Sequence, residues 1–195
     1  MKSFDDLLEE ATRIHGHICA GQVIGVRMCM LALSFLGIND PKGVDRKKMY
    51  VFVEIDRCAT DAIQTVTGCS LGKRTMKWVD HGVMAATFVN LDSGKAVRVT
   101  ALEESRELSK NYCDGIVDKY ARQLEAYKIM PEEELFRIEN VVVDIPPENL
   151  PGRPLKRVKC ENCPDWVQDK RDVVVQGKVL CRSCAQGRYY RLLEK

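Results

Sequence analysis

The sequence has 195 residues, of which 45% are hydrophobic and 30% are charged, with a net charge of +2. This balance is typical of a folded globular protein and excludes a largely disordered chain. No stretch reaches the roughly 20 apolar residues that a membrane-spanning helix needs. The first residues are acidic and amphipathic, unlike a secretory signal. We therefore expect a cytoplasmic protein without a membrane partner.

Charge and cysteine usage both divide the chain in two. Residues 151–195 carry 11 Lys and Arg against 5 Asp and Glu, whereas residues 1–150 carry 19 against 23. Four of the nine cysteines stand in two C-x2-C pairs near the end of the chain. This spacing is typical of metal ligands in a reducing compartment and not of a disulfide-rich secreted domain. The pattern predicts two bodies with different partners.

Helical and strand patterns are mixed along the first part of the chain. Apolar spacing and Gly or Pro punctuation predict helices over about 4–15, 21–36, 61–67 and 103–127, and strands over about 49–55, 74–79, 83–91, 96–102 and 138–145. Short turns such as Asp92-Ser93-Gly94 separate the three middle strands, which predicts an antiparallel meander. Helices packed on a mainly antiparallel sheet give an α+β fold.

A proline-rich segment follows this core. Four prolines lie within nine residues, at Pro146, Pro147, Pro151 and Pro154. Such a segment is stiff and extended. We therefore predict a core over 1–145, a linker over 146–157 and a small domain over 158–195.

The small domain carries a structural metal pattern. Two C-x2-C pairs stand seventeen residues apart, and the four thiols are Cys160, Cys163, Cys181 and Cys184. Two residues between cysteines let both sulfurs of a tight turn face one ion, and four thiolates suit Zn²⁺, with iron as the alternative. About 40 residues bury too little apolar surface to fold alone, so the metal must stabilise the fold. A helix over the residues after Cys184 would make this a treble-clef zinc finger.

The same domain is basic, and two interpretations of its charge stay open. The cations are Lys156, Arg157, Lys159, Lys170, Arg171, Lys178, Arg188 and Arg191. They could bind the phosphates of a nucleic acid. Few aromatic residues lie between them, however, and stacking aromatics are typical of single-strand binding. We therefore favour a solvated surface over a nucleic-acid site.

A second cluster of metal-binding residue types lies in the core, at His15, His17 and Cys19. In an extended segment these three side chains point to one side, whereas in a helix only His15 and Cys19 would share a face. Gly16 and Gly21 favour a loop. The pattern predicts a pocket for a second transition metal, expected to be Zn²⁺, with the choice of histidine left open.

Two further cysteines are predicted to join this pocket. Cys58 follows a predicted strand and Cys69 follows a predicted helix, and the ends of regular elements present functional groups. Either thiol is a candidate ligand or a candidate catalytic nucleophile or redox group. Asp61 is a candidate to orient a histidine, with Asp56 as the alternative. Lys73 could attract an anionic ligand.

Three segments together resemble a known family. HGHICAG (15–21), CATDAIQTVTGCSLGK (58–73) and VDHGVMAATF (79–88) are similar to the motifs of the FmdE-like family, which is named after a component of formylmethanofuran dehydrogenase. The resemblance covers about residues 10–145, and the four-cysteine finger matches an appendage that many members carry. It implies an α+β core in an intertwined homodimer, with a metal pocket. The pocket candidates that it implies are His15, His17, Cys19, Cys58, Asp61, Gln64 and Cys69.

The resemblance also suggests a function. We expect a metal-binding FmdE-like protein, either an accessory subunit of a molybdenum or tungsten formylmethanofuran dehydrogenase, an oxidoreductase of methanogenesis and one-carbon metabolism, or a protein that handles metals or cofactors. A stand-alone metalloenzyme with a reactive core cysteine is the second hypothesis. A zinc-finger regulator that senses metal or redox state is the third.

Overall fold

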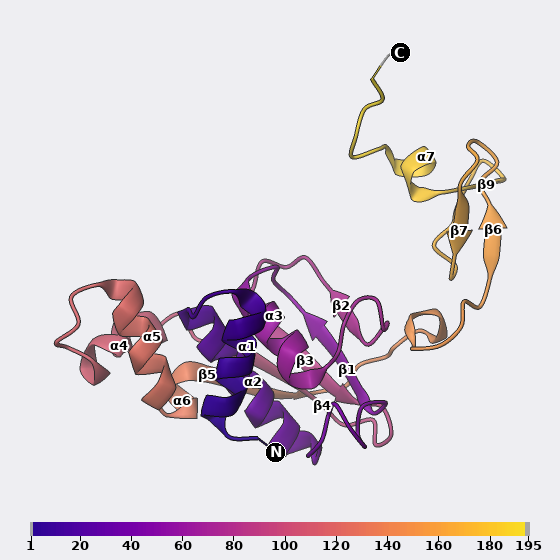
Figure 1. Ribbon diagram of the computed structural model, residues 1–195. Coiled ribbons are helices and arrows are strands. Elements are labelled where there is room, and N and C mark those ends of the chain that lie inside the picture. Colours follow the sequence, from indigo (N-terminus) through magenta and orange to yellow (C-terminus); the bar gives the residue numbers. More distant parts are fainter. Residues whose placement is uncertain (1, 194–195) are drawn as a thin grey trace. The chain divides into compact units, whose positions relative to one another are not determined.

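The computed structural model describes residues 2–193 and divides the chain into two compact units, residues 1–144 and residues 145–195 (Figure 1). The first unit packs helices on a five-stranded sheet, which confirms the predicted α+β class. The second unit holds short hairpins around a cysteine cluster. No helix within residues 2–193 is both long enough and apolar enough to span a bilayer.

The sheet has the strand order β2-β1-β3-β4-β5. Its strands are β1 (Met49–Val53), β2 (Met76–Trp78), β3 (Ala85–Asn90), β4 (Ala96–Ala101) and β5 (Phe136–Val141). The predicted meander is correct for β3 and β4, which pair antiparallel, but wrong for the strand before them. β2 pairs parallel to β1 at the edge of the sheet, with Val51 opposite Met76. The helix that connects β1 to β2 makes this parallel pairing possible, because parallel strands need a crossover.

The helices of the core surround α2. They are α1 (Phe4–His15), α2 (Ala20–Leu36), α3 (Cys58–Thr67), α4 (Ser105–Tyr112), α5 (Lys119–Ile129) and α6 (Glu132–Leu135). α2 packs against α1, α3, α5 and two strands of the sheet (Figure 1). Its central side chains are buried, as expected for a helix that is apolar on most sides. The hydrophobic core therefore lies around α2, between the sheet and the other helices.

Two glycines bring the start of α2 unusually close to α3. A Cβ added at Gly25 would lie 2.6 Å from the carbonyl oxygen of Ala59, and one added at Gly21 would lie 2.9 Å from Cβ of Cys58. Any larger residue would push the two helices apart, because real side-chain carbons do not approach so closely. The glycines therefore hold the first turns of α2 and α3 together, and the candidate site lies there.

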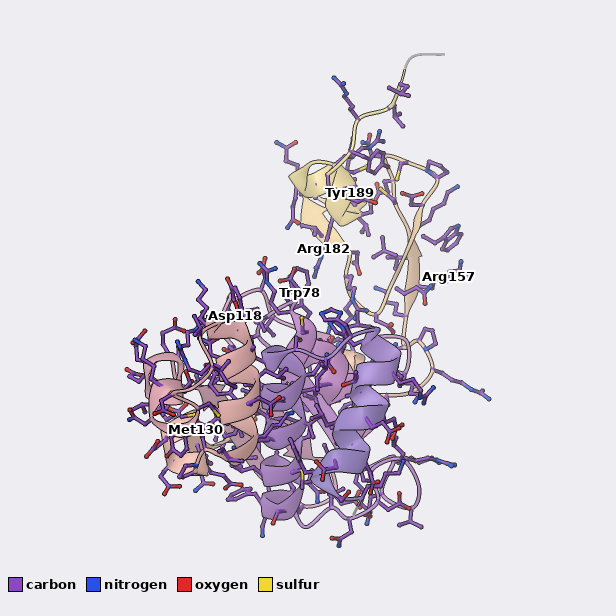
Figure 2. The ribbon with its side chains drawn as sticks, turned by 60° about the vertical axis from the view of Figure 1, so that its left-hand side comes forward. Trp78, Asp118, Met130, Arg157, Arg182 and Tyr189 are labelled. Carbon is purple, nitrogen blue, oxygen red and sulfur yellow. The ribbon has the colours of Figure 1, made fainter. Side chains whose placement is uncertain are left out.

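The single long helix predicted over 103–127 is wrong. α4 ends at Tyr112, and a turn over residues 113–118 reverses the chain before α5. Asp118 caps α5, since its Oδ1 accepts hydrogen bonds from the backbone N–H groups of Tyr120 and Ala121 at 3.1 and 2.8 Å. Figure 2 labels Asp118 and Met130 at the two ends of α5. The turn lets α5 pack on α2 and form one wall of a cavity.

The second unit contains little regular structure. Its elements are a 3-10 turn (Pro147–Asn149), β6 (Arg157–Lys159), β7 (Trp166–Gln168), β8 (Val173–Val175), β9 (Lys178–Leu180) and α7 (Arg182–Gln186). β6 pairs with β7 and β8 with β9 in two hairpins. The helix predicted after Cys184 instead begins at Arg182 and ends after five residues, because Gly187 adopts a φ of 101°. The role of residues 146–157 as a linker stays a prediction.

Candidate metal centre and adjoining cavity

The four finger thiols form one cluster. The sulfurs of Cys160, Cys163, Cys181 and Cys184 lie within 4.8 Å of one another. The backbone N–H of Cys181 donates to Sγ of Cys160 at 3.3 Å, and that of Cys184 donates to Sγ of Cys181 at 3.4 Å. The Cys181 N–H bond is the main cause that lowers the pKa of Cys160 to about 6. The finger is therefore a metal-binding site, and four thiolates at this spacing suit zinc.

A second cluster lies at the turn between α1 and α2. The ligand atoms of His15, His17 and Cys19 lie within 4.8 Å of one another. His15 is the last residue of α1, Gly16 follows it with a left-handed φ of 95°, and Cys19 is the N-cap of α2. The tight turn between two helices thus gathers three donors from five consecutive residues.

Asp61 fixes the orientation of one of these histidines. Its Oδ2 lies 2.7 Å from Nδ1 of His15, and the side chain of His15 is only 13% exposed. The carboxylate therefore accepts a hydrogen bond from Nδ1–H, which leaves a lone pair on Nε2. Nε2 is buried and has no hydrogen-bond partner within the described residues. A carboxylate behind one ring nitrogen and a bare second nitrogen is the arrangement that metal-binding histidines use.

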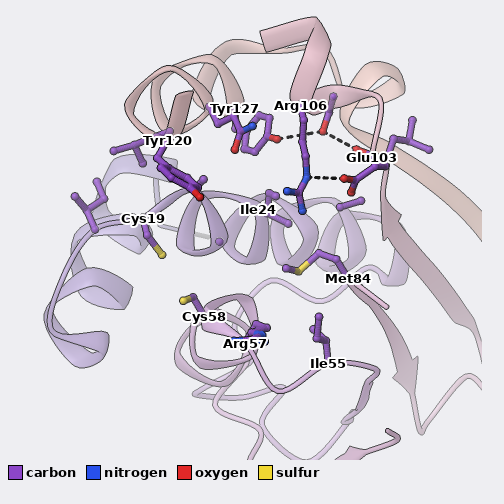
Figure 3. A pocket seen from close by; sticks show the side chains of 18 of the residues that line it. Cys19, Ile24, Ile55, Arg57, Cys58, Met84, Glu103, Arg106, Tyr120 and Tyr127 are labelled. Atoms are coloured by element: carbon purple, nitrogen blue, oxygen red, sulfur yellow. Dashed lines mark hydrogen bonds and ion pairs between the residues drawn. The ribbon is translucent and has the colours of Figure 1, made fainter. Parts of the chain in front are cut away.

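The thiol of Cys58 lies beside that of Cys19. Cys58 is the first residue of α3, one turn before Asp61. Figure 3 shows the two sulfurs pointing toward one another from α2 and α3. Burial, followed by contact with the Cys19 thiol, raises the pKa of Cys58. The structure therefore brings Cys58 next to the His15–His17–Cys19 cluster, although it starts a helix and does not directly follow a strand as predicted.

The remaining candidates lie elsewhere on or beyond α3. Cys69 is 2% exposed and follows the opposite end of this helix, whose 10 residues rise about 15 Å. Burial raises its pKa, and its nearest thiol is that of the fully buried Cys29. Lys73 Nζ donates to the carbonyl of Gly68 at 2.9 Å. Gln64 is exposed one turn beyond Asp61. The structure does not bring Cys69 or Lys73 to the thiol pair, and a role for Gln64 stays a prediction.

A buried amide supports the junction of the two helices. Gln22 is fully buried in the first turn of α2, and its Nε2 donates to the carbonyl of Cys58 at 2.6 Å. Its Oε1 has no hydrogen-bond partner within residues 2–193. The sequence analysis missed this residue. The signal was a lone polar residue in an otherwise apolar stretch, which has to find a partner when it is buried.

A partly open cavity of about 680 Å³ adjoins the two thiols. α2, α3, α5 and the segment after β4 enclose it (Figure 3). Much of its wall is apolar, with Ile24, Met84, Leu124 and Tyr127 among the lining residues. The sequence analysis missed the cavity because it treated residues 103–127 as one helix, whereas the reversal at 113–118 returns α5 to this place.

Comparisons with known proteins agree with this arrangement. The family model described as "FmdE, Molybdenum formylmethanofuran dehydrogenase operon" matches residues 14–141, which include both candidate histidines and the facing thiols. A solved structure of an FmdE-like protein of tungsten formylmethanofuran dehydrogenase, from Syntrophus aciditrophicus, matches with a TM-score of 0.63 and 23% identity, over 97% of this chain and 96% of that one. This likeness supports the fold.

A curated relative is more similar in sequence. It is a protein of Archaeoglobus fulgidus described as "Probable S-adenosyl-L-methionine-binding protein", and it is 33% identical over 96% of this chain. The chain spans only 54% of the length of that relative, so its description covers a larger protein. The family match, which covers most of the core and contains the candidate site, decides the classification. This chain belongs to the FmdE family.

Proposed function

We propose that the core binds a second transition metal ion, expected to be Zn²⁺, through His15, His17 and Cys19. The observation that carries the proposal is the state of His15, whose Nδ1 is held by Asp61 while its buried Nε2 has no partner within the described residues. A buried polar nitrogen without a partner costs free energy, and a metal ion would remove that cost. Two imidazoles and one thiolate are also ligands that zinc prefers.

The proposed site would differ in kind from the finger. Three protein ligands leave one position of tetrahedral zinc for an external group, whereas four thiolates close the coordination sphere. Such a metal would supply a Lewis acid beside the cavity. Asp61 would hold the imidazole of His15 in place, and the apolar wall with Ile24 and Leu124 would exclude water. The core would therefore bind a small molecule next to the metal.

We propose further that the chain acts as an accessory subunit or as a metal- or cofactor-handling protein. Both the family description and the matching solved structure name formylmethanofuran dehydrogenase. A larger molybdenum or tungsten enzyme is accordingly the proposed partner, and an intertwined homodimer is the proposed form of the free protein. Co-purification from native cells would test the first, and light scattering of the pure protein would test the second.

A stand-alone metalloenzyme is the second candidate function. The observation that favours it is the thiol of Cys58, which lines the cavity next to the proposed ligand Cys19. A thiol in this place can act on a molecule in the cavity without being a metal ligand. Cys58→Ser would then keep the metal and lose turnover. S-adenosyl-L-methionine, which the relative's description names, is one molecule to test in calorimetry against the metal-loaded protein.

Metal content per chain tests the main proposal. Full-length protein is expected to contain close to two metal ions per chain by mass spectrometry of the elements. His15→Ala combined with Cys19→Ser should reduce this to one, because the finger keeps its ion. Cys113→Ser is the control, since this partly buried thiol at the end of α4 belongs to neither cluster. One ion per chain in the unchanged protein would overturn the core site.

A further inference from the structure

Two helices begin at the thiol end of the cavity. α2 starts after Cys19 and α3 starts at Cys58, and neither N-terminus has a side-chain cap. The cavity is lined by Cys19, Ala20 and Gly21 from one helix and by Arg57 and Cys58 at the other. The first backbone N–H groups of a helix lack partners within it and carry partial positive charge. Two such ends at one place favour an anion.

A cation lies at the same end. Arg57 lines the cavity beside Cys58, and its guanidinium makes no ion pair within residues 2–193 (Figure 3). The other cation in the cavity wall is already paired, since Arg106 Nε lies 3.0 Å from Oε1 of Glu103. An anion that enters the cavity therefore meets an unpaired positive charge at the thiol end and a neutral pair at the other end.

The rest of the wall suits an apolar body. Ile24 is 7% exposed and Tyr127 is 3% exposed, and both line the cavity along with Met84 and Leu124. Tyr120 adds a second aromatic ring from α5. A volume of about 680 Å³ lies within the range of roughly 300–1,000 Å³ that small-molecule sites span. Apolar and aromatic walls with one charged end are typical of a site for an amphiphilic molecule.

We propose that this cavity binds an organic anion, a carboxylate on an apolar or aromatic body. The carboxylate lies between Arg57 and the starts of α2 and α3, and the body lies against Ile24, Leu124 and Tyr127. The inference goes beyond the proposed function, because the cavity, the unpaired guanidinium and the helix ends are present whether or not the core holds a metal.

Calorimetry with a matched pair of probes tests the proposal. 2-Naphthaleneacetate and 2-naphthaleneacetamide have the same ring and nearly the same shape, but only the first is charged. The full-length protein should bind one acid per chain at least tenfold more tightly than the amide. Arg57→Gln should weaken the acid to the level of the amide and leave the amide unchanged. Arg46→Gln is the control, because Arg46 is exposed and lies beyond the far end of α2.

A second variant tests the place of the body. Ala121 is exposed on α5 and lines the cavity, so Ala121→Trp should fold normally and weaken both probes at least fivefold. Thermal unfolding of each variant checks that the fold is kept. Equal affinity for acid and amide, no binding of either, or a preference for the acid that survives Arg57→Gln would overturn the proposal.

The metal content of the same samples separates this inference from the proposed function. Binding of the acid through Arg57 in protein with one ion per chain would support the organic-anion site and contradict the core metal. A preference for the acid that disappears in Cys19→Ser but persists in Arg57→Gln would assign the selection to the metal and would overturn the role given to Arg57.

Discussion

His15 and Asp61 are 46 positions apart in the sequence, and Nδ1 of one lies 2.7 Å from Oδ2 of the other. This contact joins the end of α1 to the first turns of α3, the helix that also presents Cys58. It fixes which nitrogen of His15 is free to bind. The proposed core site depends on this pair, because without Asp61 the imidazole could rotate or change tautomer.

Removal of the Asp61 carboxylate should weaken metal binding in the core. We expect Asp61→Ala to lower the affinity of the second metal by about 10- to 100-fold, as measured for comparable partners of metal-binding histidines. Competition with a zinc-selective chelator measures this affinity. Asp56→Ala is the matched control, since Asp56 is an exposed carboxylate just before α3. Equal affinities in the two variants would contradict the assigned role.

Cys69→Ser should leave the metal content unchanged. Cys69 lies at the end of α3 away from Cys58, in the apolar core. We expect two ions per chain and a loss of about 1–3 kcal/mol in the free energy of unfolding, because the variant buries a hydroxyl. Urea unfolding measures the stability, and elemental analysis measures the metal. Loss of one ion in a folded variant would return Cys69 to the ligand set.

Metal removal should unfold the finger and spare the core. The buried residues of the small unit's cluster are Cys160, Leu180 and Cys181, so the metal ligands make up most of its interior. Zinc binding in such modules contributes on the order of 10–16 kcal/mol. In the full-length protein, Cys181→Ser should collapse the amide NMR signals of residues 157–186 to unfolded positions while the signals of β1 to β5 stay in place. Dispersed finger signals in the variant would contradict this.

The Glu54–Arg98 pair should make stability depend on pH. Glu54 is 7% exposed, and its carboxylate oxygens lie 2.7 and 2.8 Å from Nε and Nη2 of Arg98. The Arg98 hydrogen bonds lower the pKa of Glu54 from its ordinary 4.5, against the opposing effect of burial. Because the pKa is lower in the folded state, the stabilisation is complete above 4.5 and is lost as the pH falls through the folded value.

Glu54→Gln separates this pair from other acid effects. The variant should lose on the order of 3 kcal/mol at neutral pH, because Arg98 keeps its charge in a partly buried place without its main partner. It should also lose less stability than the unchanged protein below pH 4.5. Urea unfolding at several pH values measures both effects. Parallel pH profiles for the two proteins would show that Glu54 does not cause the dependence.

The local patterns predicted much of this molecule. The C-x2-C pairs identified the finger cluster, and the spacing of His15, His17 and Cys19 predicted that these three would gather. Both are short-range relationships in which the backbone itself brings the donors together. The parallel pairing of β2 and the reversal before α5 depend on contacts between distant residues, and no local pattern contained them.

Cys58 and Cys69 illustrate the same limit. Both flank α3 in the sequence, and both looked like members of the core pocket. The packing of Gly21 and Gly25 against α3 brings the N-terminal end of this helix to the site, and Cys69 is left at the other end. The direction of a helix relative to its neighbours comes from such close contacts, which a single sequence does not reveal.

Anomalous scattering at the zinc and iron absorption edges from crystals of the full-length protein tests the central claim most directly. The account predicts two peaks per chain, one amid the four finger sulfurs and one within about 2.0–2.3 Å of His15 Nε2 and Cys19 Sγ. A single peak at the finger, in metal-replete crystals with an empty turn between α1 and α2, would contradict it.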